Sequence, residues 1–473
     1  MKKYDLIVLG GGAGGLVAAA GAASFGAKVA LIDPGPLGGD CLWTGCVPTK
    51  SFIHSSKLIY TAKSAGEFGL KTEGKPEFKE AKARLERAIQ TIQKHDDPQR
   101  FIDMGIDYYD GRGSFAGKHE MIIDGSEKIY GKRIVIATGA RPFIPPIQGL
   151  REAGYETNET ILKRSQTPKS LLVIGGGPIG LEYAQAFARF GSQVTVVEMA
   201  PSILIHDDED CIPPVMKTLK EEGIQIFTGA EIKEVSVTKE AKQVVMIHQG
   251  KEKKIAVTDI LVATGRTPNI EALNLDSVGI QTERGVIVVN DRLQTTLKHV
   301  YAVGDVIGKF AFTHAAGEEG KLVVSNAVLG LRRKINYQHL PWVTYTDPQV
   351  FHLGMTEREA RQKDTKIQVY KTTLAEADRF ITEQAEAGLV KIITDKRGVI
   401  LGAHAVGSDA GDWMQEIVFA KRYGHKIGDL SQVIHPYPAR TGALQKTADL
   451  FWRDKLFSSK ITKWIARYVR WFR

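Results

Sequence analysis

Apolar residues in this chain occur in short continuous runs that alternate with glycine-rich turns and alanine-rich segments. Residues 6–9 and 29–32 are apolar runs of the length of a buried strand, and residues 16–25 between them have the composition of a helix. The same order of strand, helix and strand recurs 165 residues later, from residue 171 to residue 197. This alternation predicts an α/β fold built from parallel βαβ units.

Each predicted turn from strand to helix carries the pattern Gly-x-Gly-x-x-Gly. The first lies in residues 10–15 and its unit ends on Asp33, and the second lies in residues 175–180 and its unit ends on Glu198. In such turns the first glycine makes the bend, the second lets the backbone approach a pyrophosphate, and the third lets helix and strand pack closely. One copy alone is a weak signal, but two copies with equally spaced acids predict two bound dinucleotides.

The two predicted nucleotide sites differ in the residues that come after them. The first unit leads into Cys41 and Cys46, so its ligand should exchange electrons with that pair, which favours FAD. In the second unit, Glu198 would accept a ribose 2′-hydroxyl and repel a 2′-phosphate. Because residues 199–202 bring no Arg or Lys, NADH is favoured over NADPH.

Cys41 and Cys46 are two of only three cysteines in 473 residues, and four residues separate them. So few cysteines argue against an extracellular disulfide framework and favour a redox pair, with Cys211 left as a buried or loop thiol. On the pair alone, an ordinary disulfide or two buried thiols is an equal alternative. The neighbouring dinucleotide motif favours the redox pair.

Composition and charge narrow the class of protein. A chain with 43% hydrophobic and 25% charged residues is typical of globular protein and long enough for several domains. Of its net charge of +9, residues 453–473 contribute most, with seven Lys or Arg against one Asp, so the body implies no nucleic-acid partner. With no apolar signal segment after Met1 and no run of 18 apolar residues, we expect a cytoplasmic protein.

The basic tail itself has a helical pattern. On a helical wheel that starts at Ile461, one face holds Trp464, Ile465, Tyr468 and Phe472, and the other holds Lys463, Arg467, Arg470 and Arg473. The pattern predicts an interfacial helix on anionic lipid, which would place the protein peripherally on the inner membrane face. Packing on a partner subunit and a frayed basic end are the alternatives.

Two further strings, residues 136–142 and 262–268, resemble each other: each follows an apolar strand, contains Ala-Thr-Gly and ends in Pro. They are expected where the chain enters and leaves an inserted nucleotide domain. Unrelated strand–turn segments are the alternative.

On these motifs the chain resembles the class I flavoprotein (pyridine nucleotide-disulfide) oxidoreductases, a family that includes dihydrolipoamide dehydrogenase, glutathione reductase and mercuric reductase. Residues 38–50 are similar to the redox motif of that family, and residues 301–305 to its second FAD motif. The resemblance covers residues 4–450. It implies an α/β fold with two Rossmann-like dinucleotide-binding domains, for FAD and NAD, and a C-terminal α+β interface domain that forms a homodimer.

The implied domains are an FAD-binding domain (1–147), an NAD-binding domain (148–269), a return to the FAD-binding domain (270–337), an interface domain (338–452) and the basic tail (453–473). Candidate FAD-binding residues are Gly10, Gly12, Gly14, Gly15, Asp33, Gly39, Lys50, Gly113, Thr138, Gly139, Gly304, Asp305 and Thr313. Candidate NAD-binding residues are Gly175, Gly177, Pro178, Ile179, Gly180, Glu198, Gly265 and Arg266. No metal site is assigned.

The candidate catalytic residues are Cys41, Cys46, Lys50, Glu182 and Tyr437. If a helix begins around Cys46, its N-terminus favours a thiolate there, and Lys50 shares the same face. Cys46 would then face the flavin, Cys41 would attack substrate, and Lys50 would lie near flavin N5. By the resemblance, Glu182 pairs with Lys50. A solvated lysine and a surface acid are the alternative for these two residues.

The chain departs from the family near its C-terminus. The family has a His and a Glu there, which act as an acid–base pair, but this chain aligns Tyr437 and Gly442 with those positions, and His435 lies two residues too early. A phenol with an ordinary pKa of about 10 is a poor proton shuttle at neutral pH. A tyrosine at this position resembles the mercuric reductases, which bind a metal ion instead of splitting a disulfide. Those enzymes typically carry a C-terminal cysteine pair, but this chain has no cysteine after Cys211, so mercury delivery by that route is not expected.

These expectations describe an FAD-dependent, NADH-oxidising, homodimeric reductase with a Cys41/Cys46 redox-active disulfide, no His/Glu pair and an unidentified small-molecule acceptor. Two alternatives stay open. One is an NADH:quinone or metal-ion reductase that acts directly from the flavin. The other is a membrane-tethered redox sensor.

Overall fold

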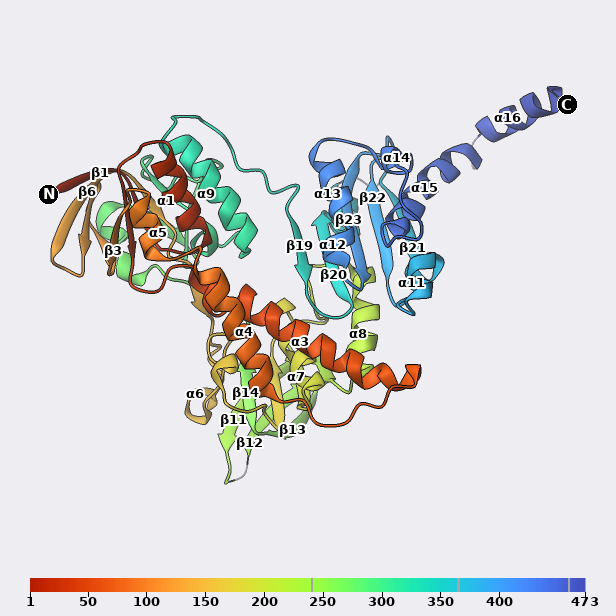
Figure 1. The fold of residues 1–473 in the computed structure, drawn as a ribbon, viewed down its shortest axis with the longest axis horizontal. Helices are drawn as coiled ribbons and strands as arrows, with labels where there is room; N and C mark the ends of the chain where they lie inside the picture. Colours follow the sequence, from red (N-terminus) through yellow and green to blue (C-terminus); the bar gives the residue numbers. More distant parts are fainter. Residues whose placement is uncertain (240, 364–365, 458–459, 473) are drawn as a thin grey trace.

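The computed structural model describes residues 1–473 except 240, 364–365, 458–459 and 473. Figure 1 shows three lobes: the N-terminal lobe around α1 and α9, a second lobe around α7, and a C-terminal lobe that begins near β19. The long helix α3 (Cys46–Ser64) and helix α4 (Phe78–Gln93) lie over the second lobe.

The N-terminal lobe is a mixed sheet with the order β3-β2-β1-β6-β5-β4, and β18 pairs with β6. Strands β1, β2, β3, β6 and β18 run parallel. The strands are β1 (Lys2–Leu9), β2 (Val29–Asp33), β3 (Asp107–Asp110), β4 (Gly113–Gly117), β5 (Glu120–Ile123), β6 (Glu127–Ile136) and β18 (Val300–Ala302). Helices α1 (Ala13–Ser24) and α9 (Thr313–Ala327) pack on each other, so the segment after residue 300 returns to the first lobe.

The second lobe repeats the first arrangement with a smaller parallel sheet, β10-β9-β8-β14, beside an antiparallel sheet, β11-β12-β13. Its strands are β8 (Ser170–Ile174), β9 (Gln193–Glu198), β10 (Gln225–Thr228), β11 (Ala230–Val237), β12 (Lys242–His248), β13 (Lys251–Val257) and β14 (Asp259–Val262). Its helices are α6 (Leu150–Ala153), α7 (Pro178–Arg189) and α8 (Ile212–Glu221). Two dinucleotide-type sheets confirm the predicted repeat of βαβ units.

The C-terminal lobe is an antiparallel sheet with the order β19-β20-β23-β22-β21. Its strands are β19 (Pro341–Thr344), β20 (Gln349–Gly354), β21 (Gln368–Thr373), β22 (Leu389–Thr394) and β23 (Ile400–Gly407). Its helices are α10 (Glu357–Lys363), α11 (Asp378–Thr382), α12 (Ala410–Trp413), α13 (Gln415–Arg422), α14 (Ile427–Leu430) and α15 (Gly442–Phe457). Buried residues of α15 such as Leu444 and Phe451 join the apolar core on this sheet, which gives the α+β layer expected of an interface domain.

The two Ala-Thr-Gly strings lie side by side. Their ends form β7 (Ala140–Pro142) and β15 (Arg266–Pro268), which pair antiparallel in a two-stranded sheet. This pairing agrees with two crossings between the first and second lobes, one in each direction.

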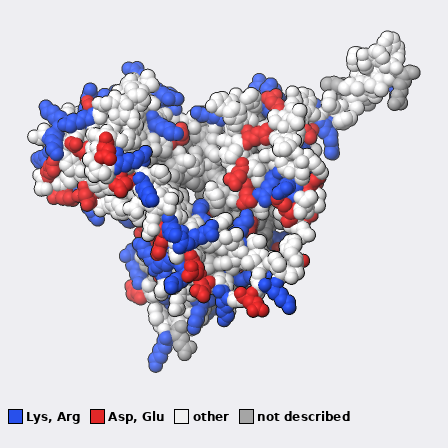
Figure 2. All heavy atoms as spheres, viewed as in Figure 1, with Lys and Arg blue, Asp and Glu red and all other residues white. Residues whose placement is uncertain are grey.

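The predicted tail helix is present as α16 (Lys460–Trp471), which projects away from the body beyond α15 (Figure 1). In the described part of the chain, no helix combines the length and apolarity that a membrane span requires. Figure 2 shows that Lys and Arg mix with Asp and Glu on the visible face of the body.

Candidate active site

The two glycine turns have the same geometry. Gly10 and Gly175 have φ of 104° and 113°, and a Cβ on them would lie 2.3 and 2.4 Å from a backbone oxygen. A Cβ on Gly15 or Gly180 would lie 1.9 or 2.1 Å from the oxygen of the first glycine in its turn. First and third positions therefore require glycine for conformation and for packing, as the motif predicts.

The second glycine of each turn faces open space. A Cβ on Gly177 would meet no atom within 4 Å, and one on Gly12 would meet only the Cα of Gly39, at 4.0 Å. Both residues are N-caps, of α7 and α1, and neither helix start has a side-chain cap. Amide groups at an uncapped helix N-terminus with open space in front suit a pyrophosphate. Each of the two turns thus offers a cradle that fits the pyrophosphate of a dinucleotide.

The acids at the ends of the second strands also correspond. The Asp33 carboxylate accepts hydrogen bonds from the backbone amides of Gly11 (2.5 Å) and Gly35 (2.8 Å). In the same way, the Glu198 carboxylate accepts hydrogen bonds from the backbone amides of Gly176 (2.6 Å) and Ala200 (2.7 Å). Each carboxylate is therefore fixed beside its glycine turn, where a ribose would lie.

Helix α2 (Gly39–Trp43) carries Cys41, and Cys46 is the first residue of α3. Both cysteines are free thiols, and Cys46 Sγ lies 3.3 Å from Thr313 Oγ1 at the start of α9. A hydrogen bond from Cys41, together with Thr313 and the Lys50 ammonium, lowers the pKa of Cys46 to about 6, and the hydrogen bond to Cys46 raises the pKa of Cys41. The predicted division of roles, with a thiolate at Cys46 and a protonated Cys41, has this physical basis.

Lys50 lies one helical turn after Cys46 and forms an ion pair of 2.9 Å with Glu182 of α7. The Glu182 side chain is 3% exposed, and its second oxygen accepts a hydrogen bond from the Tyr345 amide at 2.9 Å. Burial opposes the charge on Lys50, but Glu182 outweighs it and raises the pKa of the ammonium. Lys50 Nζ also lies 4.7 Å from the Tyr345 ring centre, so the ammonium is held in place beside Cys46.

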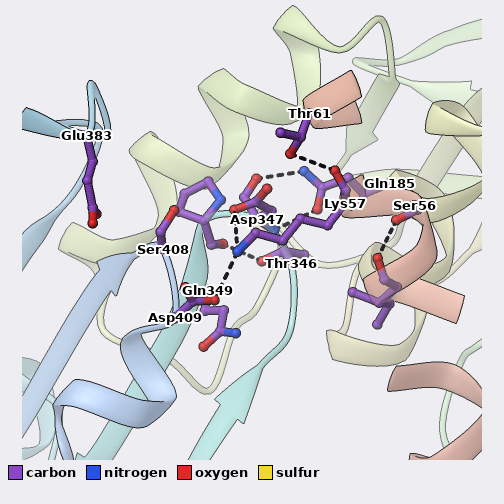
Figure 3. Close-up of polar contacts among 12 residues, drawn as sticks. Ser56, Lys57, Thr61, Gln185, Thr346, Asp347, Gln349, Glu383, Ser408 and Asp409 are labelled. Atoms are coloured by element: carbon purple, nitrogen blue, oxygen red, sulfur yellow. Dashed lines mark hydrogen bonds and ion pairs between the residues drawn. The ribbon is translucent and has the colours of Figure 1, made fainter. Parts of the chain in front are cut away.

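The far part of α3 is anchored by charge and by aromatic packing. Lys57 Nζ lies 2.9 Å from Asp409 and 3.9 Å from Asp347, two acids of the C-terminal lobe (Figure 3). On the opposite side, the buried Phe52 ring stacks on Phe190, 4.9 Å between centres. The helix that carries Cys46 and Lys50 is thus fixed to both other lobes.

The second FAD motif reaches the same region. Gly304 and Asp305 follow β18, and Asp305 lies 2.9 Å from the guanidinium of Arg266. Burial raises the pKa of Asp305, and Arg266 opposes that rise. Arg266, expected at the nicotinamide nucleotide, lies between Asp305 and Asp40, which also approaches it at 3.1 Å. Both acids belong to segments that the sequence analysis assigned to FAD binding, and no sequence signal identifies this position of Arg266.

The other candidate binding residues lie in turns, in close-packed positions or at the surface. A Cβ on Gly14 would lie 3.0 Å from Val303, and one on Gly113 would lie 2.7 Å from Leu9, so these two glycines allow close packing in the first lobe. Thr138 Oγ1 donates to the Asn269 carbonyl at 2.7 Å. The remaining candidates are Gly139 and Gly265, both with positive φ, Pro178 at the first turn of α7, Ile179, which is 39% exposed, and Gly39, whose Cβ would lie 2.8 Å from Gly12.

Within one chain, Tyr437 is not in contact with the cysteines. Its side chain is 82% exposed, and its hydroxyl donates to Asp378 of the C-terminal lobe at 2.9 Å. His435 forms a pair with Glu416 at 2.8 Å, and its other ring nitrogen lies 3.1 Å from the Val433 carbonyl. Both nitrogens of this imidazole therefore have a polar partner within the chain. Cys211, which was expected to be a buried or loop thiol outside the redox pair, is buried, and burial raises its pKa.

Two dinucleotide cradles and a cysteine pair, with a lysine beside it that pairs with a buried glutamate, define a nucleotide-dependent dithiol oxidoreductase. Residues 4–320 match the pyridine nucleotide-disulphide oxidoreductase family, and residues 340–448 match the dimerisation domain of the same family. The chain belongs to this family of enzymes, which supports a flavin and a pyridine nucleotide as cofactors and a homodimer as the assembly.

Similar proteins cover nearly the whole chain. A mercuric reductase of Lysinibacillus sphaericus is 33% identical over 96% of this chain and 83% of its own length. A dihydrolipoyl dehydrogenase of Thermus scotoductus is 33% identical over 95% of this chain and 97% of its own length. The structure of the HOCl-induced flavoprotein disulfide reductase RclA from Escherichia coli, solved as a Cu(II) complex, superposes with a TM-score of 0.85 at 28% identity and covers 95% of this chain and 100% of RclA.

Proposed function

We propose that the protein is an FAD-dependent, NADH-oxidising reductase in which Cys41 and Cys46 form the redox-active pair. The observation that carries the proposal is the placement of Cys46 at the start of α3, where Cys41, Thr313 and Lys50 all favour its thiolate. FAD, when bound, supplies the chemistry that accepts a hydride and passes electrons to the cysteines.

The chain's own residues would divide the remaining work. Asp33 and Asp305 would hold the ribose and ribityl chain of FAD, and the amides at the start of α1 would hold its pyrophosphate. Cys46 would face the flavin as a thiolate. Cys41, whose pKa is raised, would keep its proton until it attacks an acceptor.

The Lys50 ammonium would lie at the edge of the flavin where negative charge develops. Glu182 keeps that ammonium charged and oriented, because their contact of 2.9 Å is largely shielded from solvent at the carboxylate. A group that is already positioned does not have to reorganise during the reaction.

For the nicotinamide nucleotide we propose NADH. Glu198 is fixed by two backbone amides beside the second glycine turn, where it would accept a ribose hydroxyl. The next residue in the chain, Met199, is 76% exposed and uncharged, so it offers nothing to bind a 2′-phosphate.

The acceptor is proposed to be one that needs no proton on a thiol leaving group, such as a quinone or a metal ion. The proposal is supported by Tyr437 and Gly442, which stand at the positions of the family acid–base pair. The names of the mercuric reductase relative and of the RclA copper complex agree with metal-ion chemistry in this family. The second candidate mechanism is direct electron transfer from the flavin to the acceptor, without the cysteine pair.

The tail is proposed to hold the enzyme on an anionic membrane surface. Helix α16 projects from the body, and Trp464 (74%), Trp471 (83%) and Phe472 (69%) are largely exposed. Residues 453–473 include seven Lys or Arg. Basic residues near such a surface contribute about 1 kcal/mol each, and the aromatic rings suit headgroup depth. A membrane tether of this kind would also suit a redox sensor. Rapid turnover with any acceptor would exclude that alternative function.

Reductive titration and an acceptor screen test the proposal. With dithionite under anaerobic conditions, the FAD-loaded enzyme should take up one more two-electron equivalent than its Cys41→Ser variant; equal uptake would contradict the redox pair. In the screen, quinones and metal ions should turn over faster than glutathione disulfide or lipoamide, because a missing acid–base costs about 10² to 10⁴-fold. A Cys41→Ser variant that keeps full turnover would instead favour the flavin route.

A further inference from the structure

Arg266 lies between two carboxylates that come from distant parts of the chain. Its Nε is 2.9 Å from Asp305, one Nη is 3.1 Å from Asp40, and the other Nη donates to the Ala140 carbonyl at 2.6 Å. The guanidinium side chain is only 16% exposed. This bridge joins helix α2, strand β15 and the turn after β18.

Asp40 is held on its other side as well. Its second carboxylate oxygen accepts hydrogen bonds from the Thr44 hydroxyl and from the side-chain amide of Asn158, the latter at 3.3 Å. The Asn158 side-chain amide also donates to the carbonyl of Thr44, the C-cap residue of α2, at 3.2 Å. Because Asp40 directly precedes Cys41, these contacts fix the helix that carries the outer thiol.

The carboxylate of Asp40 also acts on the thiols through charge. The pKa of Cys41 is raised first by its hydrogen bond to Cys46 and by burial, and Asp40 adds to that rise. The pKa of Cys46 is lowered chiefly by the hydrogen bond from Cys41, and Asp40 works against that lowering. A disulfide has no thiolate for Asp40 to repel, so the carboxylate destabilises only the reduced pair.

We propose that the Asp40–Arg266–Asp305 bridge positions the Cys41 helix and sets the electron-donating strength of the cysteine pair. Asp40 makes the dithiol a stronger reductant, and Arg266 limits that effect by neutralising the carboxylate. Both are positioning residues that act through the thiols. The inference rests on the proposed redox role of Cys41 and Cys46 and adds the residues that set its driving force.

The test is a thiol–disulfide equilibrium measured on the FAD-loaded enzyme in glutathione buffers of graded ratio. As the Cys41–Cys46 disulfide forms, the pair loses two electrons and the Cys41 thiol loses its proton. Glutathione disulfide takes up the two electrons, that proton and one proton from solvent to give two glutathione molecules. After acid quenching and alkylation, mass spectrometry of the peptide that contains both cysteines gives the oxidised fraction. No turnover is needed for this measurement.

Asp40→Asn should shift the equilibrium about tenfold toward the dithiol, which is about 30 mV for a two-electron couple. Arg266→Gln should shift it in the opposite direction, because the Asp40 charge would stand without its counter-ion. Asp96→Asn is the matched control. The Asp96 carboxylate lies beside Gly38 at the start of α2, 3.1 Å from the position that a Cβ on Gly38 would take, and it has no part in the bridge. It should leave the equilibrium unchanged.

Shifts of the same sign in Asp40→Asn and Arg266→Gln would mean that the charge of Asp40 does not set the thiol–disulfide equilibrium, and they would overturn the proposal. If Arg266→Gln does not fold, Asp40→Glu decides: it keeps the charge and should stay near the wild-type equilibrium, whereas a shift equal to that of Asp40→Asn would overturn the role of charge. A wild-type enzyme that forms no Cys41–Cys46 disulfide in any buffer would refute the proposed redox pair itself.

Discussion

Replacing Cys41 by alanine should remove most of the acidity of Cys46. The hydrogen bond from Cys41 is the largest cause of the low Cys46 pKa, about 6 against an ordinary value of 9.0. At pH 7 a thiol with a pKa of about 6 is about nine-tenths ionised, and one with a pKa near 9 is about one-hundredth ionised. Thr313 and Lys50 remain in the variant, so we expect a partial rise of the pKa and a thiolate fraction at pH 7 that falls severalfold or more.

Alkylation of Cys46 by iodoacetamide measures this change, because only the thiolate reacts. Rates for the Cys46 peptide would be followed between pH 5 and pH 9 in the reduced, FAD-loaded enzyme and in Cys41→Ala. The midpoint of the rate profile should move to higher pH in the variant. Cys211→Ala, which removes a buried thiol away from the pair, should leave the profile in place. An unchanged midpoint in Cys41→Ala would refute the view that Cys41 donates to the Cys46 thiolate.

Three further predictions concern the nucleotide, the tail and the core. Glu198→Ala should narrow the preference of kcat/KM for NADH over NADPH, and an NADPH preference in the unmodified enzyme would overturn the assignment. A chain that ends at Asp454 should lose co-sedimentation with anionic vesicles, which high salt should also weaken in the full chain; equal binding by both chains would exclude the tail as the anchor. Lys391→Met should lower the free energy of unfolding by about 3–5 kcal/mol, because the buried Asp208 carboxylate, 2.8 Å away, would lose this ion-pair partner. Denaturant unfolding measures the loss, and Lys396→Met, at an exposed position, is the control.

The parts of the site that follow from local pattern could be predicted. The glycine turns, the acids Asp33 and Glu198, and the start of a helix at Cys46 each depend on residues close in sequence, so motif spacing and periodicity carry them. Pairing of Lys50 with Glu182 required the family resemblance, since 132 positions separate the two residues.

Single ionic contacts between distant segments could not be predicted. Arg266 was expected at the nicotinamide nucleotide, yet it lies against Asp40 and Asp305, and His435 pairs with Glu416. One charged side chain has no periodicity that would mark its partner, and several acids in the chain could have served each base equally well.

The two nucleotide units, the redox motif and the amphipathic tail can be predicted from the amino-acid sequence, because short-range sterics and hydrophobic periodicity specify such elements. The arrangement of charge around the cysteine pair depends on the tertiary structure, which places the buried Glu182 carboxylate against Lys50 and Arg266 between Asp40 and Asp305. Those properties depend on distance and burial, and the folded chain alone sets both.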